Sequence, residues 1–258
     1  MILSDFHTHT KYCDGNNTPE EMILEAISRG MKKLGFSGHS YTPFDEAPCM
    51  SPEGTEQYRH EIAALKEKYS GQIEILCGIE QDYYSSIPAK DYDYVIGSVH
   101  YVDINGECLH VDNTPEMFSR LIHECNDDPY NAAEKYYSLV SDVVNRTGAN
   151  IIGHFDLFTK LNERHKYFDE DNPRYITAAM NALDTLIETG AVFEINTGAI
   201  SRGYRSFAYP SMRLLKRIAE KGGSVILSSD AHNKNNLMYK FPEYEELALS
   251  LGLNIVEL

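Results

Sequence analysis

Seven short apolar segments alternate with helical patterns along this chain, and this alternation is the feature that most restricts its fold. The segments are mostly continuous apolar runs, which is typical of strands covered by helices on both faces. Such an alternation predicts an α/β fold with a parallel sheet, and 258 residues are enough for that sheet to close into a barrel. The predicted strands are residues 1–6, 34–37, 73–77, 94–99, 150–153, 192–195 and 224–228.

The intervening helices carry recognisable start and stop signals. Thr18 is a good N-cap, Pro19 suits the first turn, Glu21 completes a capping box, and Gly30 can end that helix. No internal repeat, low-complexity tract or linker is seen, so we predict one domain over residues 1–258. The predicted helices are residues 18–30, 51–70, 129–146, 174–189, 210–221 and 242–251, and a further helix begins at residue 114. A small hairpin is predicted around Asn105-Gly106.

The charge of the chain limits the partners that it can bind. Its 23 basic and 39 acidic residues give a formal charge of −16, which disfavours long nucleic acid and anionic membranes because few cations are available to neutralise phosphates. A small phosphorylated substrate held by metal ions remains compatible with this charge. No signal peptide or apolar run of membrane-spanning length is present. Five scattered cysteines without a Cys-x-x-Cys motif indicate reduced thiols and a cytoplasmic location, and the oligomeric state is not indicated.

Potential metal ligands follow the predicted strands. The carboxyl ends of parallel strands meet at one face of an α/β fold, so these side chains are expected to converge there. His7 and His9 are two residues apart on an extended segment and can face one point in space. The candidate ligands are His7, His9, Asp14, His39, Glu80, His100, His154, Asp230 and His232.

The remaining histidines are weaker candidates. His60 and His123 fall on predicted helix surfaces, whereas His110 and His165 fall in loops near the expected mouth. Imidazole and carboxylate ligands together favour Zn, Mn or Fe over Mg or Ca. Nine ligands exceed the coordination of one ion, so two or three divalent ions are expected, bridged by a carboxylate such as Glu80 or Asp230.

Six ordered motifs resemble the PHP (polymerase and histidinol phosphatase) family along nearly the whole chain. The layout is most similar to stand-alone histidinol-phosphate phosphatases of that family. The resemblance implies a distorted seven-stranded (β/α)7 barrel, mostly parallel, with a trinuclear metal centre. The motifs are His7-Thr-His9 with Asp14-Gly15, Gly38-His39-Ser40, Gly78-Ile79-Glu80, Gly97-Ser-Val-His100, Gly153-His154-Phe-Asp156 and Ser229-Asp230-Ala-His232.

The same resemblance implies a ligand set for each ion. The first ion would take His7, His9, Glu80 and Asp230; the second would take Glu80, His100 and His154; the third would take Asp14, His39 and His232. Some family members have a histidine where this chain has Asp14, so the identity and occupancy of the third ion stay open. The implied reaction is hydrolysis of L-histidinol phosphate, in histidine biosynthesis, by a metal-activated hydroxide.

Basic side chains near the strand ends are candidates for binding the phosphate. Arg202 follows the sixth strand and can bind phosphate through two parallel hydrogen bonds. Related phosphatases have a base six residues after the strand-five histidine, where this chain has Lys160. Arg202 and Lys160 are therefore our candidates for a catalytic, phosphate-binding role. Arg164 and Arg205 are better interpreted as solvated charges on loops.

The leaving group and the reaction class leave alternatives open. Asp103, Glu107, Asp112, Glu163, Asp169, Glu170 and Asp171 are acids that can bind a cationic leaving group, and Tyr83, Tyr84, Tyr101 and Tyr204 are candidates for the pocket wall. One alternative function is a phosphodiesterase or exonuclease acting on nucleotides or short oligonucleotides. Others are a non-catalytic metal-binding module and an amidohydrolase, which usually has eight strands.

Overall fold

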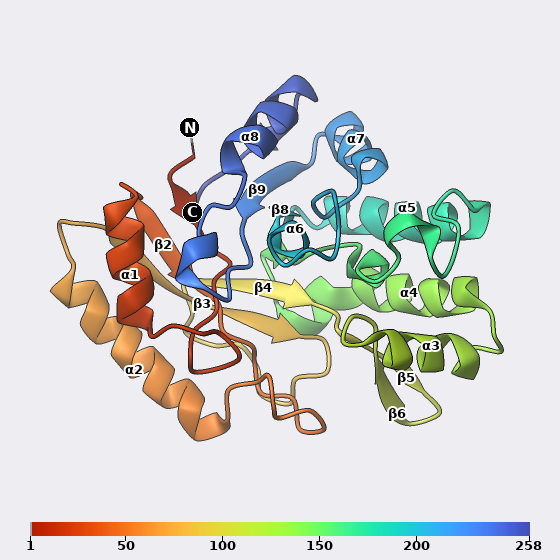
Figure 1. Ribbon diagram of the computed structural model, residues 1–258, viewed down its shortest axis with the longest axis horizontal. Helices are drawn as coiled ribbons and strands as arrows, with labels where there is room; N and C mark the ends of the chain where they lie inside the picture. Colours follow the sequence, from red (N-terminus) through yellow and green to blue (C-terminus); the bar gives the residue numbers. More distant parts are fainter. Residues whose placement is uncertain (1) are drawn as a thin grey trace.

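The structure, a computed structural model, describes residues 2–258, so Met1 of the first predicted strand lies outside the described residues. One sheet of eight parallel strands runs through the molecule in the order β1-β2-β3-β4-β7-β8-β9-β10. Figure 1 shows this sheet curling through the molecule with helices around its outside. The strands are β1 (Ser4–Asp5), β2 (Lys33–Phe36), β3 (Glu74–Asp82), β4 (Tyr94–Ser98), β7 (Ile151–Ile152), β8 (Val192–Asn196), β9 (Ser224–Ser228) and β10 (Asn254–Ile255).

The curled sheet comes back on itself just beyond the ends of β1 and β9. Thr8 and Ala231 form a parallel bridge, in which the His9 N–H donates to the Ala231 carbonyl at 2.9 Å and the Ala231 N–H donates to the His7 carbonyl at 3.1 Å. The predicted distorted, mostly parallel barrel is therefore confirmed, with eight strands among the described residues instead of seven. The eighth strand, β10, was not predicted, because Asn254 and Ile255 form no continuous apolar run and become a strand by pairing with β9.

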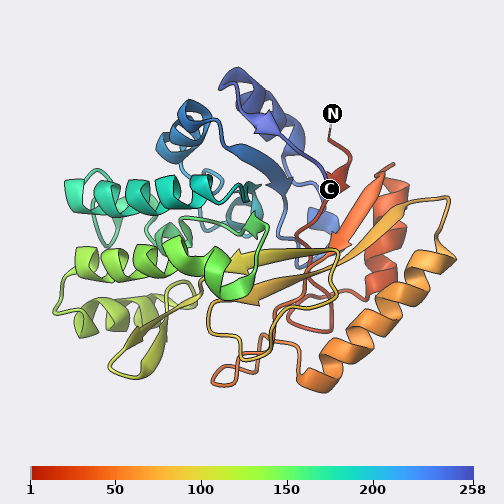
Figure 2. The ribbon, with the colours of Figure 1, turned by 180° about the vertical axis from the view of Figure 1, so that it is seen from behind.

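The helices pack around the outside of the curled sheet. Figures 1 and 2 show α1 and α2 together on one side and α3, α4 and α5 stacked on the other. The predicted capping box of α1 is present, since Thr18 Oγ1 accepts from the Glu21 N–H and Glu21 Oε2 accepts from the Thr18 N–H. The helices are α1 (Pro19–Ser28), α2 (Pro52–Lys68), α3 (Pro115–Glu124), α4 (Pro129–Thr147), α5 (Pro173–Glu188), α6 (Gly198–Ser201), α7 (Met212–Lys221) and α8 (Phe241–Ser250).

Two smaller features lie outside this alternation. The predicted hairpin is confirmed: β5 (Tyr101–Ile104) and β6 (Glu107–His110) pair antiparallel across Asn105-Gly106, both of which have positive φ. The long loop of residues 155–173 contains two short 3₁₀ turns, at Leu157–Thr159 and Glu163–His165. Among the described residues, no helix has the length and apolar character needed to cross a membrane.

A buried tyrosine fills part of the barrel interior. Tyr94 packs with Phe6, Ile96, Ile151 and Ile226 in a cluster separate from the larger core beneath the helices. Its hydroxyl donates to the backbone carbonyls of residues 6 and 36, which joins the first two strand segments to β4. Hydrogen bonding of this buried hydroxyl is required, because an unpaired polar group in the interior is costly.

The close approach of β3 to the Tyr94 ring predicts that Gly78→Ala destabilises the protein. A Cβ at Gly78 would lie 2.2 Å from Tyr94 Cζ, so the ring or β3 would have to move. We expect a loss of about 1–3 kcal/mol, the usual cost of overpacking a core, measured by urea unfolding. Gly54→Ala on the surface of α2 is the matched control, because its Cβ would approach only Ser51 Oγ, at 3.2 Å. Equal stability of the two variants would contradict the prediction.

Candidate metal centre

The predicted ligands come together at the carboxyl ends of the strands. His7 and His9 follow β1, His39 follows β2, His100 follows β4 and His154 follows β7. Asp230 and His232 follow β9, and Asp14 lies on the loop before α1. Glu80 differs from its prediction: β3 does not end before it but continues to Asp82, because Gln81 and Asp82 still pair with Gly97 and Ser98 of β4.

Glu80 lies at the centre of this group and is 1% exposed. Its two carboxylate oxygens face imidazole nitrogens from five different histidines, so one carboxylate can serve more than one ion. The distances are 2.9 Å from Oε2 to His39 Nδ1, 3.3 Å to His7 Nε2 and 3.6 Å to His9 Nε2, and 2.8 Å from Oε1 to His154 Nε2 and 3.4 Å to His100 Nε2.

Two aspartates face the same histidines from other directions. Asp230 Oδ1 lies 3.3 Å from His9 Nε2 and 3.8 Å from His7 Nε2. Asp14 Oδ1 lies 3.6 Å from His39 Nε2, and its Oδ2 lies 3.1 Å from His232 Nε2. Both aspartates therefore lie where a carboxylate ligand is needed beside an imidazole pair.

The ligand atoms form four overlapping groups that are each small enough to surround one ion. Four of the ligands, His7, His9, His39 and Glu80, each belong to two of these groups, so the boundaries between the sites are shared. The groups are His9-Asp14-His39-His232, His7-His9-Asp230, His7-Glu80-His154 and His39-Glu80-His100. Of the three ligand sets that the resemblance implies, Asp14-His39-His232 falls within one of these groups. The other two sets are divided differently, because Glu80 is not grouped with His9 and Asp230, and His100 and His154 belong to different groups.

Unpartnered polar atoms show that this donor set fits a metal. His7 Nε2, His9 Nε2 and Glu80 Oε2 are buried and have no hydrogen-bond partner among the described residues, although His7 Nε2 and Glu80 Oε2 are only 3.3 Å apart. Their orientation does not suit a hydrogen bond, and leaving such atoms unpaired is expensive. A divalent ion between them would use their lone pairs, and imidazole with carboxylate is the donor chemistry of Zn, Mn and Fe sites.

The charges within the group are strongly coupled. Burial by itself lowers the pKa of His7 and of His39, but carboxylates outweigh it and raise both pKa values: Glu194, Glu80 and Asp230 for His7, and Glu80 and Asp14 for His39. Burial raises the pKa of Glu80, yet the surrounding imidazoles hold it well below its usual value. Burial and the neighbouring imidazoles of His232 and His39 lower the pKa of His9 to about 3.

Several buried acids that support the ligands were missed from the sequence. Glu194 Oε1 accepts from His7 Nδ1 at 2.7 Å, and Asp82 Oδ2 accepts from His100 Nδ1 at 3.0 Å. Asp5 accepts from the Ser229 N–H at 3.1 Å, and burial raises the pKa of Asp5 to about 6. A signal was available, because Asp5 and Glu194 are charged residues inside apolar strands, where an acid is rarely found unless it is paired.

A pocket of about 510 Å³ opens above the ligands, and both phosphate-binding candidates line it. Lys160 Nζ donates to Asp112 Oδ2 at 2.8 Å. Arg202 Nη2 donates to Asp230 Oδ2 at 2.9 Å, and its Nη1 donates to the Asp230 carbonyl at 2.8 Å. Both cations thus lie at the pocket, and each is held by an aspartate.

Few of the acids predicted for the leaving group reach this pocket. Of the seven, Asp112 lines it, and of the four tyrosines, Tyr101 and Tyr204 do. Asp45, not predicted, also lines the pocket: its Oδ2 accepts from the Tyr101 hydroxyl at 2.7 Å and lies 3.2 Å from His110 Nε2. His110 is on β6 rather than in a loop.

Of the remaining predictions about surface residues, some are confirmed and one is wrong. His60 and His123 are exposed on helices, as expected, and His165 pairs with Asp169 away from the pocket. The prediction that Arg205 is a solvated loop charge was wrong. Its side chain is 13% exposed, and its Nη1 donates to Glu170 Oε1 at 2.9 Å and to the Thr159 carbonyl at 3.0 Å.

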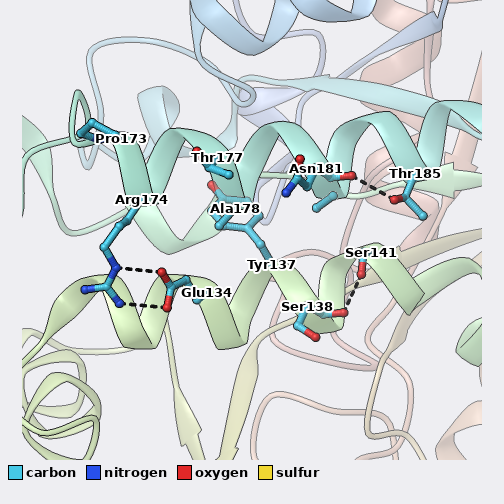
Figure 3. Close-up of a pocket in the computed structure, with 11 residues that line it drawn as sticks. Glu134, Tyr137, Ser138, Ser141, Pro173, Arg174, Thr177, Ala178, Asn181 and Thr185 are labelled. Atoms are coloured by element: carbon cyan, nitrogen blue, oxygen red, sulfur yellow. Dashed lines mark hydrogen bonds and ion pairs between the residues drawn. The ribbon is translucent and has the colours of Figure 1, made fainter.

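A second hollow of about 500 Å³ lies on the outer surface between α4 and α5 (Figure 3). The described residues that line it include no histidine, cysteine or aspartate, and their one cation, Arg174, is paired with Glu134 at 2.8 and 2.9 Å. This hollow has none of the clustered imidazoles found at the strand ends.

The chain is similar in sequence to known proteins along most of its length. The model of the PHP domain family matches residues 5–198, which include seven of the nine candidate ligands. The chain is similar to a probable histidinol-phosphatase of Deinococcus radiodurans, with 30% identity over 93% of this chain and 90% of the relative. It is also similar to a histidinol-phosphatase of Bacillus subtilis, with 26% identity over 95% of this chain and 99% of the relative.

A solved structure has the same fold. It is a histidinol phosphate phosphatase from Lactococcus lactis, in complex with zinc, L-histidinol and phosphate. The two superpose with a TM-score of 0.71 and 21% identity, covering 98% of this chain and 95% of the other. At this identity, the likeness shows the fold alone.

Proposed function

The chain belongs to the PHP domain family, and from that premise we propose that it is a metal-dependent phosphomonoesterase that hydrolyses L-histidinol phosphate to L-histidinol and phosphate. The observation that carries the proposal is the set of buried, unpartnered ligand atoms around Glu80, at the floor of a pocket lined by Lys160 and Arg202. The chain matches relatives named histidinol-phosphatase along almost their whole lengths, and this similarity supports the choice of substrate.

The proposed cofactor is two or three divalent ions, of Zn, Mn or Fe. We assign the ligands as the resemblance to the PHP family implies: His7, His9, Glu80 and Asp230 for the first ion; Glu80, His100 and His154 for the second; and Asp14, His39 and His232 for the third. Bound divalent ions activate water for attack and neutralise charge on the phosphoryl group.

The protein's own groups have two tasks in this reaction. Lys160 and Arg202 are proposed to bind phosphoryl oxygens, where negative charge is spread in the transition state. Fixed cations stabilise that charge without having to reorganise during the reaction. Because Arg202 also binds both the side chain and the backbone of Asp230, it contributes to holding that ligand in place.

A phosphate-release assay tests the proposal. Protein loaded separately with Zn, Mn and Fe is supplied with L-histidinol phosphate, a 3′,5′-bisphosphonucleotide and a short oligonucleotide. Free phosphate is measured for the two monoester substrates, and nucleoside monophosphates are measured for the oligonucleotide, because cleavage of a phosphodiester releases no free phosphate. Turnover of L-histidinol phosphate well above that of the other two supports the proposal. Preference for either nucleotide substrate favours the phosphodiesterase or exonuclease alternative, and no turnover by the metal-loaded protein favours a non-catalytic module.

Strand number does not separate this proposal from the amidohydrolase alternative. The expectation that an amidohydrolase has eight strands loses its force, because β10 makes this sheet eight-stranded. The family match over residues 5–198 is what separates the two. The cytoplasmic location stays a prediction that rests on the free cysteines.

Loss of the Lys160 ammonium is expected to lower catalytic efficiency without loss of metal. Lys160→Met should lower kcat/KM about 10- to 100-fold, the equivalent of one charged hydrogen bond worth about 1.5–3 kcal/mol, while the metal content stays unchanged. Steady-state kinetics and elemental analysis measure the two quantities. Lys166→Met is the matched control, because Lys166 is exposed on the same loop and does not line the pocket. An unchanged kcat/KM for Lys160→Met would remove Lys160 from the phosphate site.

A further inference from the structure

A buried glutamate connects two of the candidate ligands. Glu194 on β8 is 1% exposed, and its Oε1 accepts from His7 Nδ1 at 2.7 Å. Its Oε2 accepts from the His154 backbone N–H at 3.0 Å and from Asn196 Nδ2 at 3.0 Å. Both carboxylate oxygens are therefore used in hydrogen bonds within the protein, which leaves Glu194 as a partner of ligands and not a ligand itself.

The contact with His7 determines which of its nitrogens is free. An ionised carboxylate can only accept a hydrogen bond, so the proton of His7 must be on Nδ1. When His7 is neutral, the lone pair is then on Nε2, the buried, unpartnered atom that faces Glu80 and Asp230. Carboxylates that bind the second nitrogen of a metal-binding histidine generally fix its tautomer and ring orientation in this way.

The contact with His154 acts on a second ligand through the backbone. Glu194 holds the His154 N–H, while the His154 ring places Nε2 2.8 Å from Glu80 Oε1. His7 and His154 belong to the same group around Glu80, and both are almost fully buried. One side chain on β8 therefore constrains ligands that come from β1 and β7.

Asp82 shows the same construction on another ligand. Its Oδ2 accepts from Nδ1 of His100 at 3.0 Å and from the His100 backbone N–H at 3.1 Å. Asp82 contacts one candidate ligand, whereas Glu194 contacts two. The geometry of the candidate ligands therefore depends more on Glu194 than on Asp82.

We infer that Glu194 is a positioning residue of the metal centre, which holds His7 and His154 in the geometry that binds a divalent ion next to Glu80. The inference rests on the proposed metal site but not on the substrate. It predicts that metal affinity depends on the direction of the hydrogen bonds made by residue 194, and not only on the presence of a side chain of this size.

Glu194→Gln tests this dependence because an amide cannot accept on both sides. If the introduced glutamine accepts from His7, its NH₂ group faces two other donors, the His154 N–H and Asn196 Nδ2. If it accepts from those donors, its NH₂ group faces His7 and forces the proton onto Nε2, the nitrogen that should bind the ion. We expect zinc affinity of the metal-free protein, measured by competition with a chromophoric chelator, to fall about 10- to 100-fold.

A double variant provides the rescue. In Glu194→Gln with Asn196→Asp, the introduced glutamine can donate to the introduced aspartate while its oxygen accepts from His7, and the total buried charge is unchanged. The second oxygen of the new carboxylate can still accept from the Gly198 N–H, as Asn196 Oδ1 does at 2.9 Å. The His154 N–H still faces the NH₂ group of the introduced glutamine, so we expect the double variant to recover part of the lost zinc affinity, the part that depends on His7. Glu134→Gln is the matched control, because Glu134 lies on α4 and pairs with Arg174 at the surface.

The outcomes separate this inference from its alternatives. Zinc affinity of Glu194→Gln equal to that of the wild type would overturn it, as would equal losses in the single and double variants. Loss of the folded metal-free state in Glu194→Gln, seen by circular dichroism, would assign Glu194 to folding and also overturn it. Wild-type protein that binds zinc without releasing phosphate from L-histidinol phosphate removes only the proposed substrate, and wild-type protein that binds no zinc removes both.

Discussion

Glu80→Ala is expected to abolish phosphate release, with a loss of more than about 10³-fold, above the effect of removing one electrostatic contact from an active site. The carboxylate faces five imidazoles and is assigned to two of the three ions, so its removal takes a ligand from both. It also removes a buried carboxylate that raises the pKa values of His7 and His39. Elemental analysis of the purified variant is expected to show fewer ions per chain than in the wild type.

Glu74→Ala is the matched control for this experiment. Glu74 is on the same strand, β3, but at its amino end, where the side chain is 56% exposed and lies 3.3 Å from Lys33 Nζ. An exposed ion pair of this kind contributes little to stability, so activity and metal content are expected to be unchanged. The assignment of Glu80 would be wrong if the two variants retained the same activity while circular dichroism showed that both were folded.

Removal of the metal is expected to abolish activity and to lower the thermal stability of the protein without unfolding it at room temperature. A ligand present at 100 times its dissociation constant stabilises the native state by about 2.7 kcal/mol, which for a chain of this size is roughly 5–10 °C in Tm. The buried cores under the helices and within the barrel do not involve the metal ligands and are expected to keep the chain folded. Calorimetry with and without a chelator measures the shift.

Restoration by added metal is the control for chelation. Activity and Tm should return when Zn, Mn or Fe is supplied in excess of the chelator, and the ion that restores the highest activity identifies the preferred cofactor. Full turnover by protein shown to be free of metal would refute the proposed mechanism. An unchanged Tm together with lost activity would place the ions at the surface instead of in the buried group around Glu80.

Much of the framework could be predicted from local sequence patterns. The capping box at Thr18 and Glu21 forms as predicted, and Asn105-Gly106 makes the expected hairpin turn. These features depend on residues only a few positions apart, so the local sequence contains the information needed. The convergence of the ligands was also predictable, because parallel strands in an α/β fold bring their carboxyl ends to one face.

The predictions that were wrong or incomplete involve residues distant in sequence. Strand β3 continues past Glu80 because β4 pairs with it, and β10 is a strand only because β9 lies beside it. Arg205 was expected in solvent, but its largely buried side chain donates to Glu170 and to the Thr159 carbonyl. None of these partners can be identified from the neighbouring residues in the chain.

Local sequence patterns were enough to predict the alternation of strands and helices, and with it the face at which imidazoles and carboxylates gather. The three-dimensional packing determines which nitrogen of each histidine faces Glu80, which aspartate binds each pocket cation, and that Glu194 contacts both His7 and His154. The two kinds of feature depend on interactions of different range along the chain. Strand and helix patterns arise from neighbours along the chain, whereas hydrogen bonds among buried side chains depend on the packing of strands that are 40 to 187 residues apart in sequence.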